Sequence, residues 1–207
     1  MRESLNTFLS KCVCKDDPNL VSLRGGRWHI KPEQVDRFFI LYERTAKRFT
    51  EEHAKSLTFQ WPQIKRLPIV LDFDLKYDSE VSLDSSELAN FVKLIAEGIP
   101  ETVEMDDNLV EWYIVRKETG YWKQMATGKT WKNGFHVYFP TLRATLEETA
   151  ETRKYVMPLV PDHFSNYTNT VADIVDEALV KRRNGTMLIG DFKKTKGSGG
   201  RYQAVPR

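Results

Sequence analysis

Cysteine is scarce in this chain: only Cys12 and Cys14 occur among its 207 residues. A zinc knuckle needs a second pair of ligands at the right spacing, and no second cysteine pair exists to complete one. So few cysteines fit an intracellular, thiol-reduced protein best.

Long apolar runs and an excess of either charge are missing as well. No apolar stretch reaches membrane-spanning length, and residues 1–6 lack the apolar core of a signal peptide, so we expect no membrane partner. The 31 basic side chains nearly cancel the 29 acidic ones, which leaves a formal net charge of +2. A basic binding site must therefore be a local cluster.

The composition itself is that of an ordered protein. Hydrophobic residues make up 41% of the chain and charged residues 29%, an ordinary globular balance. The length suits one large domain or two small ones. We expect a single domain over residues 1–207, with a mainly helical N-terminal part (1–60) and a core (61–207). The mixture of helical and strand periodicities predicts an α/β or α+β fold.

Periodicity and capping signals place the main elements. Helices are predicted over residues 32–49, 85–98, 145–158 and 170–179. Strands are predicted over residues 67–75, 111–117, 134–140 and 186–190. A polar segment (118–133) separates two of the strands, and a basic, glycine-rich loop (191–201) follows the last one.

The most strongly patterned stretch is residues 67–75. Its odd positions are all apolar, whereas Asp72 and Asp74 occupy even positions. In a β-strand the two carboxylates therefore share the face that points away from the core. Like charges this close repel, and a divalent cation such as Mg²⁺ relieves the repulsion. A half-exposed strand with two solvated acids explains the pair equally well, so the pair alone leaves both interpretations open.

A second patterned strand carries His136. Apolar residues at positions 135, 137 and 139 alternate with Gly134, His136 and Tyr138, so His136 points away from the core. Taken alone, His136 is best interpreted as a structural histidine. Beside a carboxylate pair on a neighbouring strand, it would bind a phosphate or a nucleotide sugar. Gly134 would let a substrate approach the backbone closely.

Two further acids lie in the predicted helix over residues 170–179. Asp173 falls three residues after Thr170 and so supports the helix N-terminus. Asp176 has no such capping role, and taken alone it belongs to a solvated helix face.

The loop over residues 191–201 is basic. Lys193, Lys194, Lys196 and Arg201 lie among four glycines of residues 190–201, so backbone N–H groups and cations are both available to a polyanion. The loop is not a P-loop, because no Gly-Lys-Ser/Thr follows a strand at the right spacing. A mobile surface loop is the alternative interpretation.

Aromatic and basic residues alternate between positions 112 and 132. Such a set can stack the bases and hold the phosphates of a single nucleic-acid strand. Its members are Trp112, Tyr121, Trp122, Trp131, Lys117, Lys123, Lys129 and Lys132. We expect half of the aromatic residues to belong to the core instead.

Taken in order, these motifs resemble the archaeo-eukaryotic primase superfamily. Its pattern is a strand of three hydrophobic residues followed by Asp-hydrophobic-Asp, a later small-x-His strand, and a further acid followed by a basic nucleotide-binding segment. Here these are Ile69-Val-Leu-Asp-Phe-Asp74, Gly134-Phe-His136, and Asp176 with Lys193. The chain looks most like the N-terminal primase domain of the primase–helicases of large nucleocytoplasmic DNA viruses such as African swine fever virus. The resemblance covers about residues 38–202.

The resemblance implies an α+β primase fold with a mixed sheet similar to that of RNA-recognition motifs. It implies a DNA primase that also extends primers, a nucleotidyltransferase that uses NTP or dNTP on a single-stranded DNA template. Two Mg²⁺ or Mn²⁺ ions would be held by Asp72, Asp74 and Asp176, and the helical period around Asp176 leaves Asp173 as an alternative third acid. His136 and Gly134 would meet the incoming nucleotide.

The nucleotide's triphosphate would meet Lys193, Lys194 and Arg201. The chain departs from the family pattern in having Ile189-Gly-Asp-Phe before these lysines, which leaves the choice between Lys193 and Lys194 open.

The resemblance also implies partners. A ring-forming, hexameric helicase domain is expected in the same longer chain, so we expect more protein after Arg207, acting at viral replication sites in host cytoplasm. Two alternatives remain open: a non-catalytic single-strand-binding module that loads a helicase, and a two-metal nuclease.

Overall fold

The computed structural model describes residues 3–50, 54–60, 65–106, 109–117, 119–126, 128–180, 186–190 and 202–205. The chain divides into two compact units. One contains Met1–Pro62 and Asn184–Tyr202, and the other contains Gln63–Arg183 and Gln203–Arg207. No helix in these ranges is long and apolar enough to cross a membrane.

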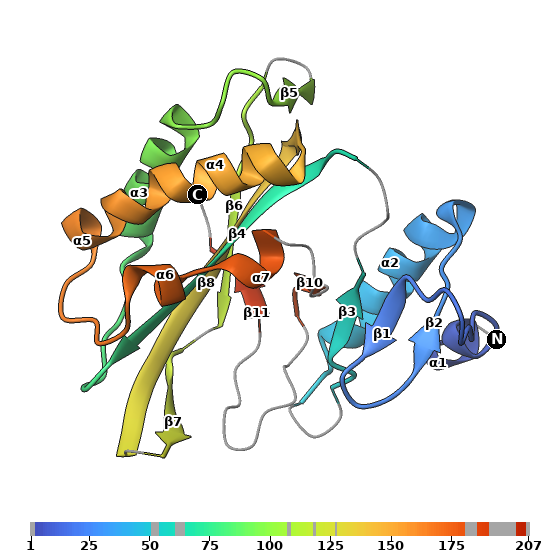
Figure 1. Ribbon diagram of the computed structural model, residues 1–207. Helices are drawn as coiled ribbons and strands as arrows, with labels where there is room; N and C mark the ends of the chain where they lie inside the picture. The colour runs from blue at the N-terminus through green and yellow to red at the C-terminus, as the bar shows by residue number, and fades with distance from the viewer. Residues whose placement is uncertain are drawn as a thin grey trace. The chain divides into compact units, whose positions relative to one another are not determined.

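The first unit combines helices with a small sheet (Figure 1). Its helices are α1 (Leu5–Ser10), the 3₁₀ turn η1 (Pro32–Gln34) and α2 (Val35–Ala46), the last two where the periodicity predicts a helix. Its antiparallel sheet has the strand order β10 (Thr186–Met187), β3 (Leu57–Phe59), β1 (Leu20–Ser22) and β2 (Arg27–Trp28). The Tyr42 hydroxyl of α2 donates to the Ile189 carbonyl at 2.8 Å, which connects the turn after β10 to α2.

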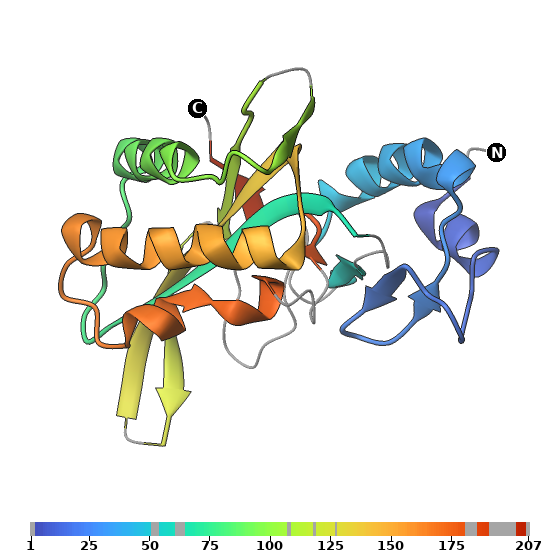
Figure 2. The same ribbon diagram turned by 45° about the horizontal axis from the view of Figure 1, so that its top comes forward.

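The second unit is built on a long antiparallel pair, β4 (Leu67–Tyr77) and β8 (Gly128–Ala144), which crosses the middle of Figures 1 and 2. The other strands pair with these two or extend the sheet: β5 (Glu104–Met105), β6 (Tyr113–Lys117), β7 (Tyr121–Met125), β9 (Val175–Asp176) and β11 (Tyr202–Ala204). The predicted α+β class is confirmed. β8 begins earlier than predicted. The polar segment over residues 118–133 forms β7 and the first residues of β8, and these two pair as an antiparallel hairpin.

One face of this sheet packs on helices. Phe73 of β4 stacks on Phe135 of β8 with ring centroids 4.6 Å apart, and Phe91 of α3 (Ser85–Glu97) meets Phe73 edge-on at 5.4 Å. α4 (Leu146–Val156), η3 (Met157–Leu159) and α5 (Val160–His163) follow β8 and add Val156 and Val160 to the same core. The N-cap of α3 is Asp84, whose side chain accepts from the Ser86 and Glu87 N–H groups. Because apolar odd-numbered residues of β4 and β8 enter this core, Asp72 and Asp74 of β4 and the even-numbered residues of β8 from Lys132 to Tyr138 point to the opposite face.

The predicted helix over residues 170–179 is wrong as a single element. Thr170 caps α6 (Val171–Ile174) as expected, but the chain then leaves the helix, and α7 (Glu177–Val180) is a separate turn. Between them β9 pairs with the edge of β4, and Arg153 of α4 donates to the Val175 carbonyl at 2.8 Å. Val175 is fully buried, so the strand edge and the core outweigh the local helical period.

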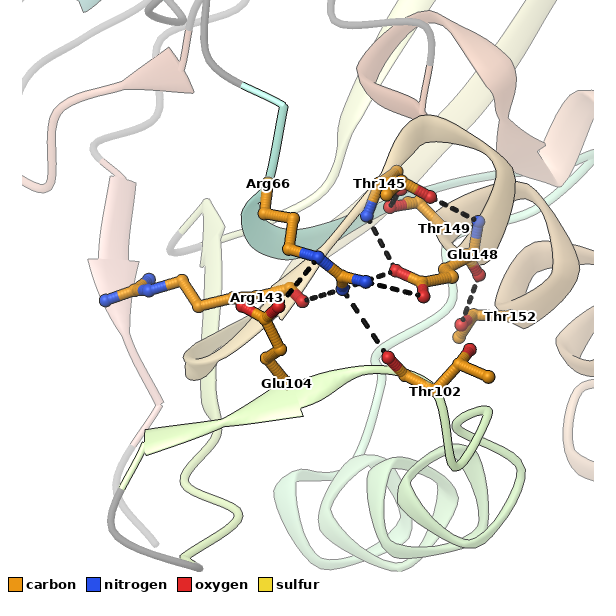
Figure 3. Close-up of polar contacts among 8 residues, drawn as sticks. All are labelled: Arg66, Thr102, Glu104, Arg143, Thr145, Glu148, Thr149 and Thr152. Carbon is orange, nitrogen blue, oxygen red and sulfur yellow. Dashed lines mark hydrogen bonds and ion pairs between the residues drawn. The ribbon is translucent and has the colours of Figure 1, made fainter.

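A group of charged side chains connects the start of β4 to α4 and β5 (Figure 3). The Arg66 guanidinium makes a bidentate pair with Glu148, at 2.8 and 3.2 Å, and its Nε lies 3.0 Å from Glu104. Glu148 also completes a capping box at the start of α4, where it accepts from the Thr145 N–H. We call Arg66, Glu104, Thr145 and Glu148 the Arg66 cluster.

Candidate metal centre

Three carboxylates converge on the sheet face opposite α3. Asp72 and Asp74 come from β4, and Asp176 of β9 lies directly across from Asp72 in the antiparallel pairing. One oxygen of each lies within 4.8 Å of the other two, and all three residues are half-buried. Closely spaced carboxylate oxygens are the ligands that Mg²⁺ and Mn²⁺ prefer. We call these three residues the acidic centre, and they fit a divalent cation.

The alternation of β4 places the first two acids as the sequence predicts. Leu71, Phe73 and Leu75 are completely buried, whereas Asp72 and Asp74 between them remain partly exposed. A strand with this pattern must turn both carboxylates to one face once its apolar row enters the core.

The structure distinguishes the two acids that the sequence left open. The exposed Asp173 exchanges hydrogen bonds with Thr170, at 2.8 and 3.2 Å, and so belongs to the cap of α6. Asp176 joins the acidic centre instead, and one of its oxygens accepts from the Ala178 N–H at 2.8 Å. The β-branched pair Ile174-Val175 is the only local signal for a strand at this point, and it is weak.

A lysine lies beside the acidic centre. The Lys132 ammonium is 2.6 Å from Asp74, and both side chains are mostly buried. Burial alone lowers the pKa of Lys132, but the charge and the hydrogen bond of Asp74 outweigh burial and leave this pKa raised. Sequence reasoning counted Lys132 only among the basic residues near the aromatics. Its position in the sequence indicated this site, because Lys132 lies four residues before His136 and therefore on the same face of a strand.

His136 lies between Asp72 and a tyrosine. Its Nε2 is 3.1 Å from Asp72, its pairing partner across β4 and β8, and its Nδ1 is 3.3 Å from the Tyr138 hydroxyl. Burial, and next the charge of Asp72, raise the pKa of Tyr138, so this hydroxyl keeps its proton and can donate to Nδ1. Nε2–H then donates to Asp72, which fixes the ring beside the carboxylate.

Gly134 is required by the strand next to it. A Cβ atom at this position would lie 2.4 Å from the Phe73 carbonyl oxygen and 3.1 Å from the Asp74 carboxylate. The groups that approach Gly134 closely are therefore the β4 backbone and the Asp74 side chain, where a substrate was expected. A larger residue at this position would displace the Asp74 carboxylate.

Sequence reasoning missed Asn169. Its side chain donates to the Asp74 carbonyl at 2.8 Å and accepts from the Lys76 N–H at 3.0 Å. Asn169 thus pairs with the backbone N–H and carbonyl groups at the edge of β4 just beyond β9, as a neighbouring strand would. These hydrogen bonds hold the backbone that carries Asp74.

Part of the predicted site cannot be placed. Lys193, Lys194 and Arg201 lie outside the described residues. Among the described residues, the acidic centre thus has one ammonium group and one imidazole in contact with three carboxylates.

An α+β domain that gathers three carboxylates on neighbouring antiparallel strands has the ligand set of a site for divalent metal ions. The sequence matches the family model of the C962R protein N-terminal AEP domain over residues 19–204. The chain belongs to this family, and the resemblance to archaeo-eukaryotic primases (AEP) is confirmed. No curated protein matches the chain. Family membership indicates a primase-like nucleotidyltransferase role, and the acidic centre is consistent with the divalent metals that such domains use.

Proposed function

We propose that this domain is a DNA primase that also extends primers: it transfers nucleotides from NTP or dNTP onto a growing strand, directed by a single-stranded DNA template. The observation that supports the proposal best is the convergence of Asp72, Asp74 and Asp176, because Asp176 pairs with Asp72 across the sheet although the two are 104 positions apart in the chain (176 − 72). A non-catalytic single-strand-binding module has no need of three carboxylates held against their mutual repulsion.

The three acids of the centre are proposed to hold two Mg²⁺ or Mn²⁺ ions. Bound there, divalent cations would neutralise the charge of the triphosphate and lower the pKa of the attacking hydroxyl. His136, whose ring Tyr138 and Asp72 orient, is proposed to contact the phosphates of the incoming nucleotide. Positioning and charge neutralisation then provide most of the rate gain.

Three further parts of the proposal depend on the family resemblance. Lys193, Lys194 and Arg201 are proposed to grip the triphosphate. A hexameric helicase domain in the same longer chain is the proposed partner. The proposed setting is viral DNA replication.

The test is incorporation of labelled nucleotides on a single-stranded template with Mg²⁺ or Mn²⁺. Because the acids would hold the metal, Asp72→Ala with Asp74→Ala should lower the rate by roughly a thousandfold or more, about 4 kcal/mol in barrier. Asp176→Asn should have a similar effect. Asp173→Asn, which alters an acid three residues away that caps α6, is the matched control and should keep nearly full activity.

Incorporation at the parental rate by the double variant would rule out the proposed metal ligands. Degradation of the template without added nucleotides, abolished in the same variants, would instead indicate the two-metal nuclease.

A further inference from the structure

The aromatic and basic residues around position 120 divide between the two faces of one hairpin. β7 pairs with residues 128–132 of β8, and we call this ribbon the β7–β8 hairpin. Tyr121 lies opposite Lys132, and Lys123 opposite Thr130, so these four residues share one face. The cross-strand pairs of Trp122 with Trp131 and of Gln124 with Lys129 belong to the other face.

The first of these faces continues the face of the acidic centre. Along β8, Lys132 has the same parity as Gly134 and His136, and its ammonium group contacts Asp74. Lys76 of β4 lies directly opposite Lys132. The buried Lys117 ammonium lies 3.8 Å from the centre of the Tyr121 ring, so the end of β6 supports this ring.

Three lysines and one tyrosine therefore lead from Asp74 towards the hairpin tip. We call this set the lysine row: Lys76, Lys132 and Lys123, with Tyr121. In Figure 1 the hairpin extends past the helices of the second unit, at the lower left. The sequence of residues 119–133 contains three lysines and no acidic residue, so the hairpin carries positive charge along its length.

The reverse face of the hairpin is held against the body of the same unit. The Trp122 indole donates to the Glu80 carboxylate at 2.9 Å, and the Trp131 indole donates to the Val81 carbonyl at 3.0 Å. The two rings meet edge-on, with centroids 5.5 Å apart. A cavity of about 400 Å³ lies on this side, and Glu80 is part of its lining. The lining also includes Arg116, whose guanidinium donates to the Leu83 carbonyl at 2.6 Å. The hydrogen-bonded indole groups make this face a support for the hairpin.

We propose that the lysine row is the track along which a single nucleic-acid strand approaches the acidic centre. This inference deepens the proposed function and rests on it, because it assigns the template to one face of the sheet. Proteins that bind single strands combine a positively charged path with an aromatic side chain on which bases stack, and the lysine row provides both. The reverse-face tryptophans, although more conspicuous in the sequence, do not contact the strand.

Lys123 and Lys129 offer a matched test, because both are exposed lysines of the same hairpin on opposite faces. The measurement is fluorescence anisotropy of a fluorescein-labelled 20-mer of thymidine with the full chain, without metal or nucleotide, over a range of salt concentrations. Lys123→Glu should weaken binding roughly tenfold and make the salt dependence shallower by about 0.7 in log–log slope for each phosphate that the variant no longer neutralises. Tyr121→Ala should also weaken binding roughly tenfold. Lys129→Glu should stay within about twofold of the parent, because Lys129 lies on the reverse face.

Equal weakening by Lys123→Glu and Lys129→Glu would overturn the assignment to one face, and so would no weakening by either. Thermal melting of each variant shows whether the hairpin remains folded, and Lys123→Ala repeats the test without a new negative charge. Asp72→Ala with Asp74→Ala separates this inference from the proposed function: a variant that binds the oligomer normally but incorporates no nucleotide supports both. A parent protein that binds through Lys123 but incorporates nothing contradicts only the function.

Discussion

The Arg66 cluster and the acidic centre are two groups of charges attached to the same strand, and they are balanced in opposite ways. At the start of β4, one guanidinium meets the carboxylates of Glu148 and Glu104, and Glu148 also accepts a hydrogen bond from the Thr145 backbone N–H. In the middle of β4, three carboxylates lie close together, the Lys132 ammonium contacts Asp74, and the His136 imidazole contacts Asp72.

The difference indicates what each cluster is for. A partly buried carboxylate that is matched by a bidentate guanidinium and backbone donors is satisfied within the protein, so its role is structural. Three carboxylates whose oxygens lie within 4.8 Å of one another repel, and a divalent cation relieves this repulsion. Carboxylates gathered on one face of a well-formed sheet therefore mark the candidate functional cluster better than burial does.

The largest expected effect on stability comes from breaking the balanced cluster. Glu148→Ala leaves the Arg66 guanidinium mostly buried without its bidentate partner and removes the capping box of α4. We expect a loss of about 3 kcal/mol in the free energy of unfolding, measured by urea denaturation. Glu104→Ala removes a more exposed carboxylate from the same arginine and should cost less than about 1 kcal/mol. Equal losses in the two variants would contradict the structural role of the Glu148 pair.

Divalent metal should act on the acidic centre and leave the Arg66 cluster unchanged. At a hundredfold excess over its dissociation constant, Mg²⁺ or Mn²⁺ should stabilise the parent protein by about 2.7 kcal/mol, seen as a rise in Tm. Asp176→Asn should lose most of this rise, whereas Asp173→Asn and Glu104→Ala should keep it. Without metal, Asp176→Asn should be as stable as the parent or more stable, because one of three repelling charges is gone. The same metal-dependent rise in Asp176→Asn would mean that the ions bind elsewhere.

The parts of both clusters that the sequence predicts are those set by local patterns. Alternation alone places Asp72 and Asp74 on one face, and the spacing of Thr145 and Glu148 alone predicts their capping box. Local patterns did not predict the contact of Arg66 with Glu148, which lies 82 positions away in the chain. Nor did they predict the contact of Lys132 with Asp74, which lies 58 positions away. Such pairs depend on the register of distant strands, and one sequence carries little information about register.

Asp176 also shows how tertiary contacts limit a prediction from local patterns. Its surroundings have a helical period, so a helix over residues 170–179 was the natural prediction. The edge of β4 and the burial of Val175 create a strand there instead, and these tertiary contacts brought the third acid to the centre.

Acid should affect the two clusters differently, and this is the smallest of the effects expected. Burial raises the pKa of Glu148, but hydrogen bonds from the Thr145 backbone and the Thr102 side chain, together with Arg66, outweigh burial and hold this pKa below its ordinary value of 4.5. A carboxyl with a lowered pKa contributes its full stabilisation above about 4.5, and the contribution is lost as the pH falls through the folded-state pKa. Glu148→Gln removes this titrating group, so it should lower stability at pH 7 and have progressively less effect below pH 4.5. Urea denaturation of both proteins from pH 7 to pH 3 measures this narrowing gap. A gap that stays constant over this range would mean that the Glu148 charge does not stabilise the fold, and the contrast between a satisfied and an unsatisfied cluster would then have to rest on the metal response alone.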